Sequence, residues 1–307
     1  MKIVYMGTPE FSVKVLESLL ERYQVEAVVS QPDKLVGRKK ILTETPVKKS
    51  ALKHSIKVIQ PKNIKKEYKE IISLKPDLIV TCAYGQILPK EILDCPKYGC
   101  INVHASLLPK LRGGAPIQRA IMEGYYETGI TIMYMNEGMD DGDIIKQNST
   151  SITDNDNLES LSKRLSKIGS KLLLEVITDI QNNKVKRTKQ DETMVTYAYN
   201  ITKDEEHLDF SKTSREIFNH IRALNPIPGA YAILNNKRIK IYDSIITDRF
   251  YTTKSDGEIV KCYQEGIGVS TKDGEIILTL LQPEGKNKIS GASFVNGNKE
   301  IVGNIFK

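Results

Sequence analysis

The sequence predicts an α/β fold, in which a mostly parallel β-sheet with helices is followed by a small antiparallel β-barrel. In residues 1–181, apolar runs suited to buried strands alternate with segments whose apolar residues recur at helical spacing. Strand, helix and strand in succession mark βαβ units, which build parallel sheets. In residues 230–281, five short alternating strands are separated by turn signals such as Asp273-Gly274.

The expected elements of the first part follow one another closely. Strands are predicted at residues 2–6, 25–30, 57–59, 78–83, 100–103 and 129–135, with an edge strand beginning at Ile144. Helices are predicted at residues 13–22, 46–54, 64–74, 117–123 and 158–181, with Thr8 or Ser12 as the candidate cap of the first. The first turn has one glycine instead of Gly-x-Gly-x-x-Gly, which argues against a dinucleotide site.

Two segments lack helical or strand periodicity. Residues 31–46 contain glycine and prolines and are expected to form a long loop, and loops of that length are usually functional or disordered. Residues 184–206 are polar and are predicted to be a linker. After a short helix at 217–224, the strands of the barrel are predicted at residues 230–235, 238–247, 258–263, 267–271 and 275–281.

Composition indicates a globular protein of about two domains. The chain has 307 residues, of which 40% are hydrophobic and 27% charged. No stretch approaches the ~18 apolar residues of a membrane span, and the N-terminus does not resemble a leader, so a cytoplasmic location is expected. The four cysteines form no Cys-x-x-Cys pair, which favours reduced structural thiols over a metal site.

The net charge of +7 is concentrated in one region. Residues 31–75 contain 13 Lys and Arg residues against four Asp and Glu residues, a local excess of +9. Such a cluster favours a polyanionic partner, although for the cluster taken alone a solvated lysine-rich face is the more common explanation. Residues 208–307 carry an excess of only +3, from 14 basic and 11 acidic residues, too little for tight RNA binding by charge alone.

The candidate chemistry lies at the end of the strand predicted at residues 100–103. Asn102 and His104 alternate with apolar residues, so their side chains are expected on one face. A breaker-rich loop follows, and ligands of open α/β sheets usually bind at such strand ends. The acidic turn at residues 137–143 could return a carboxylate to His104. It does not match a calcium loop, because the twelfth position from Asp140 is Ser151.

An amide, an imidazole and a carboxylate together can run an acyl transfer to an amine. The amide donates to the developing oxyanion, the imidazole moves protons and the carboxylate orients the imidazole. A lone histidine is more often a satisfied core residue, and Asp140, Asp141 and Asp143 are each ordinary turn residues. These patterns alone therefore favour an enzyme only moderately.

Longer motifs make a family resemblance specific. Asn102-x-His104, the Ser106-Leu107-Leu108-Pro109 run, and Asp140 at a spacing of 36 residues from His104 resemble the signature of formyltransferases that use 10-formyltetrahydrofolate. The chain is similar from end to end to the branch that formylates methionyl initiator tRNA for translation initiation, including the run from Arg112 to Arg119.

This resemblance implies a Rossmann-like formyltransferase domain at residues 1–189, a linker at 190–207 and an OB-like tRNA-binding domain at 208–307. It implies catalytic roles for Asn102, His104 and Asp140, with Ser106, Leu107, Leu108 and Pro109 at the folate pocket. We expect tRNA contacts from Arg38, Lys39 and Lys40. A monomer with no metal is expected.

Rival functions share part of this pattern. A formyltransferase acting on an amino sugar or a glycinamide ribonucleotide would keep the catalytic set but needs neither the basic cluster nor the barrel. A folate hydrolase or dehydrogenase is a further alternative, but the second domain lacks the Gly-x-Gly-x-x-Gly motif and the catalytic cysteine that a dehydrogenase would need. A non-catalytic tRNA-binding protein would leave the three polar residues without a role.

Overall fold

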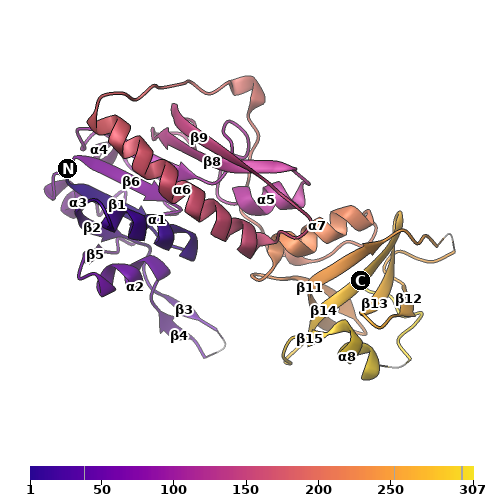
Figure 1. The fold of residues 1–307 in the computed structure, drawn as a ribbon. Helices are drawn as coiled ribbons and strands as arrows, with labels where there is room; N and C mark the ends of the chain where they lie inside the picture. Colours follow the sequence, from indigo (N-terminus) through magenta and orange to yellow (C-terminus); the bar gives the residue numbers. More distant parts are fainter. Residues whose placement is uncertain (38, 252, 299) are drawn as a thin grey trace. The chain divides into compact units, whose positions relative to one another are not determined.

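The computed structural model of the protein describes residues 1–37, 39–251, 253–298 and 300–307. Contacts divide the chain into two compact units (Figure 1). Unit 1 contains Met1–Pro116, Glu127–Ser151 and Ser162–Tyr199, and unit 2 contains Ile117–Tyr126, Ile152–Leu161 and Asn200–Lys307. The predicted fold class is confirmed. The division into residues 1–189, 190–207 and 208–307 stays a prediction.

Unit 1 is built on a seven-stranded sheet in the order β5-β2-β1-β6-β7-β8-β9. The strands are β1 (Ile3–Gly7), β2 (Val25–Val29), β5 (Lys57–Ile59), β6 (Leu78–Cys82), β7 (Cys100–His104), β8 (Glu127–Tyr134) and β9 (Ile144–Ser151). The first five of this order pair in parallel, whereas β8 runs antiparallel to both β7 and β9. The chain turns back across β1 to form β6 and β7, and their carboxyl ends lie where open sheets bind ligands.

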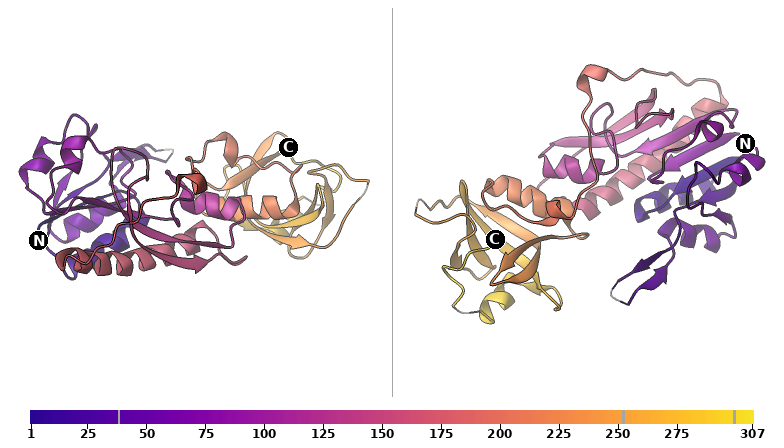
Figure 2. Two further views of the ribbon diagram at one scale, coloured as in Figure 1. Left: turned by 90° about the horizontal axis from the view of Figure 1, so that it is seen from above. Right: turned by 180° about the vertical axis from the view of Figure 1, so that it is seen from behind.

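Helices cover both faces of this sheet (Figures 1 and 2). They are α1 (Glu10–Leu20), α2 (Pro46–Lys53), α3 (Lys69–Ser73), α4 (Lys90–Leu93) and the unit 1 part of α6 (Leu158–Gln181). Helix α5 (Pro116–Met122) belongs, apart from Pro116, to unit 2. Alternate residues of β1 point to opposite faces of the sheet, and their contacts show which helices cover each face. Val4 and Met6 pack in one core cluster with residues of α3 and α4. Tyr5, between them, points to the other face, where its Oη donates to the Ser12 carbonyl of α1. On the α1 face, α6 packs Gly169 against Val103 of β7.

The start of α1 differs from the prediction. Its N-cap residue is Pro9, and no side chain caps the helix. The hydroxyls of Thr8 and Ser12 instead donate to the carbonyls of Tyr84 and Cys82, which ties the first turn to the end of β6. The carbonyls of Cys82, the last residue of β6, and of Tyr84, two residues beyond it, therefore take the hydrogen bonds of both candidate caps.

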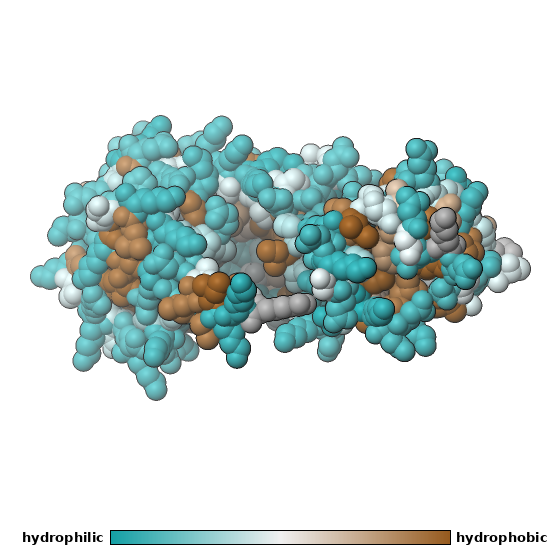
Figure 3. All heavy atoms as spheres, turned by 90° about the horizontal axis from the view of Figure 1, so that it is seen from below, coloured by the Kyte–Doolittle hydropathy of each residue, from teal (hydrophilic) through white to brown (hydrophobic). Residues whose placement is uncertain are grey.

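Residues 31–46 are not the continuous loop that the sequence predicted. They contain a hairpin of β3 (Lys34–Val36) and β4 (Ile41–Thr43), which pair antiparallel and project from unit 1 (Figure 1). All three residues of β3 are exposed, and so are Ile41 and Leu42. Figure 3 views the molecule from the side toward which the hairpin projects, and it shows apolar patches on a largely hydrophilic face.

The polar segment before residue 200 is hydrogen-bonded to the rest of unit 1. We call residues 188–198 the strap. Thr188 exchanges two backbone hydrogen bonds with Ile144 of β9, and Ala198 accepts from Ala115 N and donates to the Arg112 carbonyl. The strap includes the short 3-10 helix Glu192–Met194. The first part of the predicted linker is therefore an ordered element that lies over the loop following β7.

Unit 2 is an antiparallel sheet covered by a helix, and its core lies between them. The strand order is β10-β11-β14-β13-β12, with β15 paired to β14. The elements are the 3-10 helix Asp204–Glu206, α7 (Ser214–Leu224), β10 (Ala230–Leu234), β11 (Lys237–Thr247), β12 (Ile259–Cys262), β13 (Ile267–Thr271), β14 (Gly274–Pro283), β15 (Ile289–Ser290) and α8 (Gly291–Asn296). Thr213 and Glu216 form a capping box at the start of α7.

The cysteines are packing residues. All four are free thiols, and Cys82 and Cys100 are buried in the unit 1 sheet. Burial raises the pKa of Cys82 to about 12 and also raises the pKa of Cys100. Within the residues that the structure describes, no helix combines the length and apolar character needed to cross a membrane.

Candidate active site

Asn102 lies in the middle of β7 with its amide fixed in one orientation. Thr81 Oγ1, from the neighbouring strand β6, donates to Asn102 Oδ1 at 2.8 Å. Asn102 Nδ2 donates to Asp140 Oδ1 at 3.3 Å. Because a carboxylate only accepts, these two contacts place the Nδ2 group on the Asp140 side. This hydrogen bond occupies one of the two Nδ2 hydrogens.

His104 is buried, with an exposed fraction of 5%, and both ring nitrogens face acceptors. His104 Nε2 lies 3.0 Å from the Leu111 carbonyl oxygen, and Nδ1 lies 3.5 Å from Asp140 Oδ2. Since a carbonyl can only accept, Nε2 carries a hydrogen. A second proton, placed on Nδ1, would lie between the imidazole and the carboxylate.

Asp140 joins the two residues of β7 from the turn between β8 and β9. Its carboxylate accepts from Asn102 and also from Gly113 N, at 2.8 Å through Oδ2. Asp140 has a φ of +51°, in the left-handed region that non-glycine residues rarely occupy. In the same turn, a Cβ on Gly142 would collide with the Tyr134 carbonyl oxygen. The structure therefore brings together the three residues that the sequence singled out.

The run Ser106-Leu107-Leu108-Pro109 forms a tight turn directly after β7. Ser106 and Leu108 are buried, and Ser106 Oγ donates to the Lys110 carbonyl at 2.6 Å. Leu107 and Pro109 are half-buried. Only the latter two side chains of the predicted folate set are thus partly open to a ligand, whereas the buried pair shapes the turn.

Thr131 was missed by sequence reasoning, and it anchors this turn. Its hydroxyl donates to the Ser106 carbonyl at 2.7 Å and accepts from Leu108 N at 3.1 Å. Gln147 Nε2 also donates to this hydroxyl and to the Leu108 carbonyl, both at 2.8 Å. Thr131 lies opposite His104 in the pairing of β7 with β8. A polar residue within an apolar strand was the available signal, as it was for Thr81.

Two of the three predicted tRNA-binding residues, Lys39 and Lys40, lie elsewhere in unit 1. Lys39 and Lys40 are exposed at the tip of the β3–β4 hairpin, where Lys40 N donates to the Gly37 carbonyl at 3.1 Å. Arg38 lies outside the described residues. The two lysines belong to the hairpin tip, whereas the three polar residues belong to the sheet edge at β7 and the turn after β8.

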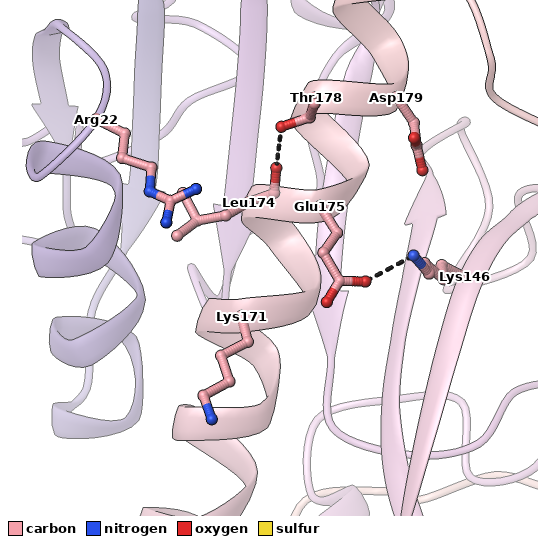
Figure 4. Close-up of a pocket in the computed structure, with 7 residues that line it drawn as sticks. All are labelled: Arg22, Lys146, Lys171, Leu174, Glu175, Thr178 and Asp179. Carbon is pink, nitrogen blue, oxygen red and sulfur yellow. Dashed lines mark hydrogen bonds and ion pairs between the residues drawn. The ribbon is translucent and has the colours of Figure 1, made fainter.

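An open depression on unit 1 lies away from these residues (Figure 4). It is lined by Arg22, Lys146, Lys171, Leu174, Glu175, Thr178 and Asp179. Lys146 Nζ pairs with Glu175 Oε2 at 2.6 Å, so these two charges in the lining of the depression neutralise each other. Within the described part of the chain, no group of three or more histidine, cysteine or acidic residues is placed to hold a metal ion.

Family models match both parts of the chain. Residues 1–177 match the family described as formyl transferase, and residues 200–299 match the formyl transferase C-terminal domain. The chain is 49% identical over 310 aligned residues to the methionyl-tRNA formyltransferase of Bacillus subtilis (strain 168), a match that covers 99% of this chain and 97% of that protein.

Two solved structures are similar at lower identity. One is WlaRD, a sugar 3N-formyl transferase in the presence of dTDP and 5-N-formyl-THF, at 26% identity and a TM-score of 0.68, covering 94% of this chain and 99% of that one. The other is the N-formyltransferase from Helicobacter canadensis in complex with folinic acid and dTDP-3-aminofucose, at 25% identity and a TM-score of 0.68, covering 92% and 99%.

Proposed function

The chain belongs to the formyl transferase family, and we propose that it transfers a formyl group from 10-formyltetrahydrofolate to the α-amino group of methionyl initiator tRNA. The observation that carries this assignment is the 49% identity to a methionyl-tRNA formyltransferase across both units, against 25–26% to the sugar formyltransferases. A folate donor is supported by the folates in the two similar structures. The product serves translation initiation, so we place the enzyme in the cytoplasm.

We assign oxyanion stabilisation to Asn102. The unprotonated methionyl amine attacks the formyl carbon, and the carbonyl oxygen becomes an oxyanion. The hydrogen of Asn102 Nδ2 that Asp140 does not accept is suited to donate to this oxygen, and Thr81 holds the amide in that orientation. A donor fixed before the reaction stabilises the developing charge without reorganising.

We propose that the His104–Asp140 pair accepts the proton that the attacking amine releases. With Nε2 hydrogen-bonded to the Leu111 carbonyl, a further proton fits between Nδ1 and Asp140 Oδ2 and converts their 3.5 Å contact into a charge-assisted hydrogen bond. Collapse of the intermediate breaks the bond from the formyl carbon to the folate nitrogen, and that nitrogen takes up the proton. All these groups come from one chain, so a monomer suffices.

We place the folate beside the turn after β7. Leu107 and Pro109 offer half-buried apolar surface there, and the backbone of the turn is held by Thr131. The buried Ser106 and Leu108 support the pocket from behind.

We place the acceptor stem of the tRNA, near its aminoacylated end, against the β3–β4 hairpin. Lys39 and Lys40 are exposed at its tip and suited to phosphates, and exposed apolar side chains lie along both of its strands. Such contacts position the amine as well as bind the RNA.

The test is a formylation assay with purified protein, 10-formyltetrahydrofolate and initiator Met-tRNA, scored by release of formyl-methionine after deacylation. The control acceptors are dTDP-3-aminofucose and uncharged tRNA. Formyl-methionine formation supports the proposal. Formylation of the amino sugar with no reaction on Met-tRNA would replace it with the rival substrate class, and binding of tRNA without turnover would favour a non-catalytic protein.

A further inference from the structure

We propose that Gln190 of the strap and Arg112 of the loop after β7 are positioning residues that hold Asp140 in its reactive geometry. The inference deepens the proposed function, because it assumes that Asp140 acts in formyl transfer. Its structural part, that Gln190 fixes the turn carrying Asp140, can be tested without turnover.

Gln190 binds the turn through both hydrogens of its amide. Nε2 donates to the Asp140 carbonyl at 2.7 Å and to the Gly142 carbonyl at 2.8 Å. Oε1 accepts from Arg112 Nε at 3.0 Å and from Arg112 Nη2 at 2.9 Å. Carbonyls only accept and a guanidinium only donates, so the chemistry of its partners fixes which way this amide points.

Arg112 is almost fully buried, with an exposed fraction of 3%. Besides Gln190, it donates through Nη1 and Nη2 to both carboxylate oxygens of Glu192, at 3.2 and 2.8 Å. Its hydrogen bond lowers the pKa of Glu192. A buried guanidinium needs such partners, and both come from the strap. The strap and the loop after β7 are thus locked together by charge as well as by backbone pairing.

The same loop also reaches His104. The Leu111 carbonyl accepts from His104 Nε2, and Gly113 N donates to Asp140 Oδ2. Leu111 and Gly113 therefore contact the His104–Asp140 pair directly, and Arg112, between them, acts on Asp140 through Gln190. The strap fixes their backbone, because Leu111 N donates to Thr196 Oγ1 at 2.9 Å. A shift of the strap would disturb both members of the pair.

Asp140 needs this support because of its backbone. Its φ of +51° is unfavourable for a non-glycine residue, and such conformations persist when the surroundings over-determine them. Gln190 supplies the donors to the carbonyls of Asp140 and Gly142. Without them the turn can relax, and a displacement of about 1 Å at a reacting group costs on the order of 10²-fold in rate.

The experiment compares Gln190→Ala and Gln190→Glu with Lys189→Ala, which alters an exposed side chain of the same strap. The glutamate keeps an acceptor for Arg112 but loses the donors to the turn. Both Gln190 variants should lower kcat for Met-tRNA formylation by about 10- to 100-fold and leave the KM of each substrate within about threefold. Lys189→Ala should match the wild type. Unchanged kcat in both Gln190 variants would overturn the proposal.

A double variant separates positioning from general destabilisation. If Gln190 acts through Asp140, Gln190→Ala should cost less than about threefold when Asp140 is already Asn, measured with excess enzyme in a single turnover. An equal loss in both backgrounds would contradict the inference.

Hydrogen exchange supplies the readout that needs no activity. Backbone amides of residues 138–143 should exchange faster in both Gln190 variants than in Lys189→Ala, and unchanged exchange would refute the structural part. Wild-type protein that fails to formylate Met-tRNA would overturn the proposed function while leaving this exchange result valid.

Discussion

Replacing Asn102 by Ala removes the amide that we assign to the oxyanion. Loss of one oxyanion donor costs roughly 10²- to 10³-fold in kcat, about 2.7 to 4 kcal/mol of transition-state stabilisation. The hydrogen bond to Asp140 is long, at 3.3 Å, so its loss adds little to this figure. The KM values should change less than kcat, because the interaction forms fully only in the transition state.

Thr81→Val is a milder change that tests the same oxyanion assignment. It leaves the amide in place but removes the 2.8 Å hydrogen bond that orients it. One hydrogen bond contributes about 0.5 to 1.5 kcal/mol, which corresponds to a roughly 2- to 10-fold lower kcat. The matched control is Thr128→Val in β8, since Thr128 Oγ1 is buried and has no hydrogen-bond partner among the described residues.

The assay is formylation of initiator Met-tRNA with both substrates saturating, together with thermal unfolding of each variant. The expected order of kcat is wild type and Thr128→Val, then Thr81→Val, then Asn102→Ala. Near-normal turnover of the Asn102 variant in a folded protein would sink the oxyanion assignment. A larger loss for Thr81→Val than for Asn102→Ala would show that Thr81 acts by another route.

Three further predictions concern the folate, the tRNA and stability. Leu107→Ala should raise the folate KM by about tenfold, for the loss of part of an apolar contact, and leave the tRNA KM within twofold. Joint replacement of Lys39 and Lys40 by Ala should weaken tRNA binding and flatten its log–log salt dependence by about 0.7 to 0.9 per lost phosphate contact, whereas an unchanged slope would mean a merely solvated surface. Arg119 hydrogen-bonds to Glu205 and lowers the pKa of Glu205 to about 2, from an ordinary value of about 4.3. The pair therefore stabilises unit 2 fully when the pH is above about 4.3, and this stabilisation is lost as the pH falls toward 2. After discounting for solvent screening of a 35%-exposed carboxylate, Glu205→Gln should lower the free energy of unfolding by about 1 kcal/mol at pH 7 and by nearly nothing at pH 2, as followed by chemical denaturation.

Local periodicity predicted how two of the three candidate catalytic residues lie. A strand repeats every two residues, so Asn102 and His104 had to share a face, and both side chains do reach Asp140. Periodicity could not choose among Asp140, Asp141 and Asp143, because a turn has no repeat. The choice of Asp140 came from its spacing in the family resemblance, and the positive φ that presents it became visible only in the structure.

Gln190 shows what a sequence pattern cannot reveal. It lies 50 residues from Asp140 along the chain, in a polar segment that indicated a linker. A hydrogen bond between a side-chain amide and a distant carbonyl leaves no periodic signal, since any polar residue suits an exposed linker equally well. Arg112 was visible only as part of a motif, and nothing in the sequence indicated that its guanidinium is buried.

The β3–β4 hairpin, where the sequence predicted a loop, differs from the prediction for another reason. Leu35, Val36, Ile41 and Leu42 are exposed by 63%, 54%, 61% and 64%. Leu35 pairs with Leu42 and Val36 with Ile41, so both faces of the hairpin carry apolar side chains in solvent. An isolated two-stranded hairpin is marginally stable, and burial against unit 1 does not support these side chains. Exposed apolar surface of this kind is typical of interaction sites, and the basic residues at the tip suit the polyanion that we propose to bind there. The departure from the usual burial pattern is thus explained if the hairpin completes its packing on the tRNA.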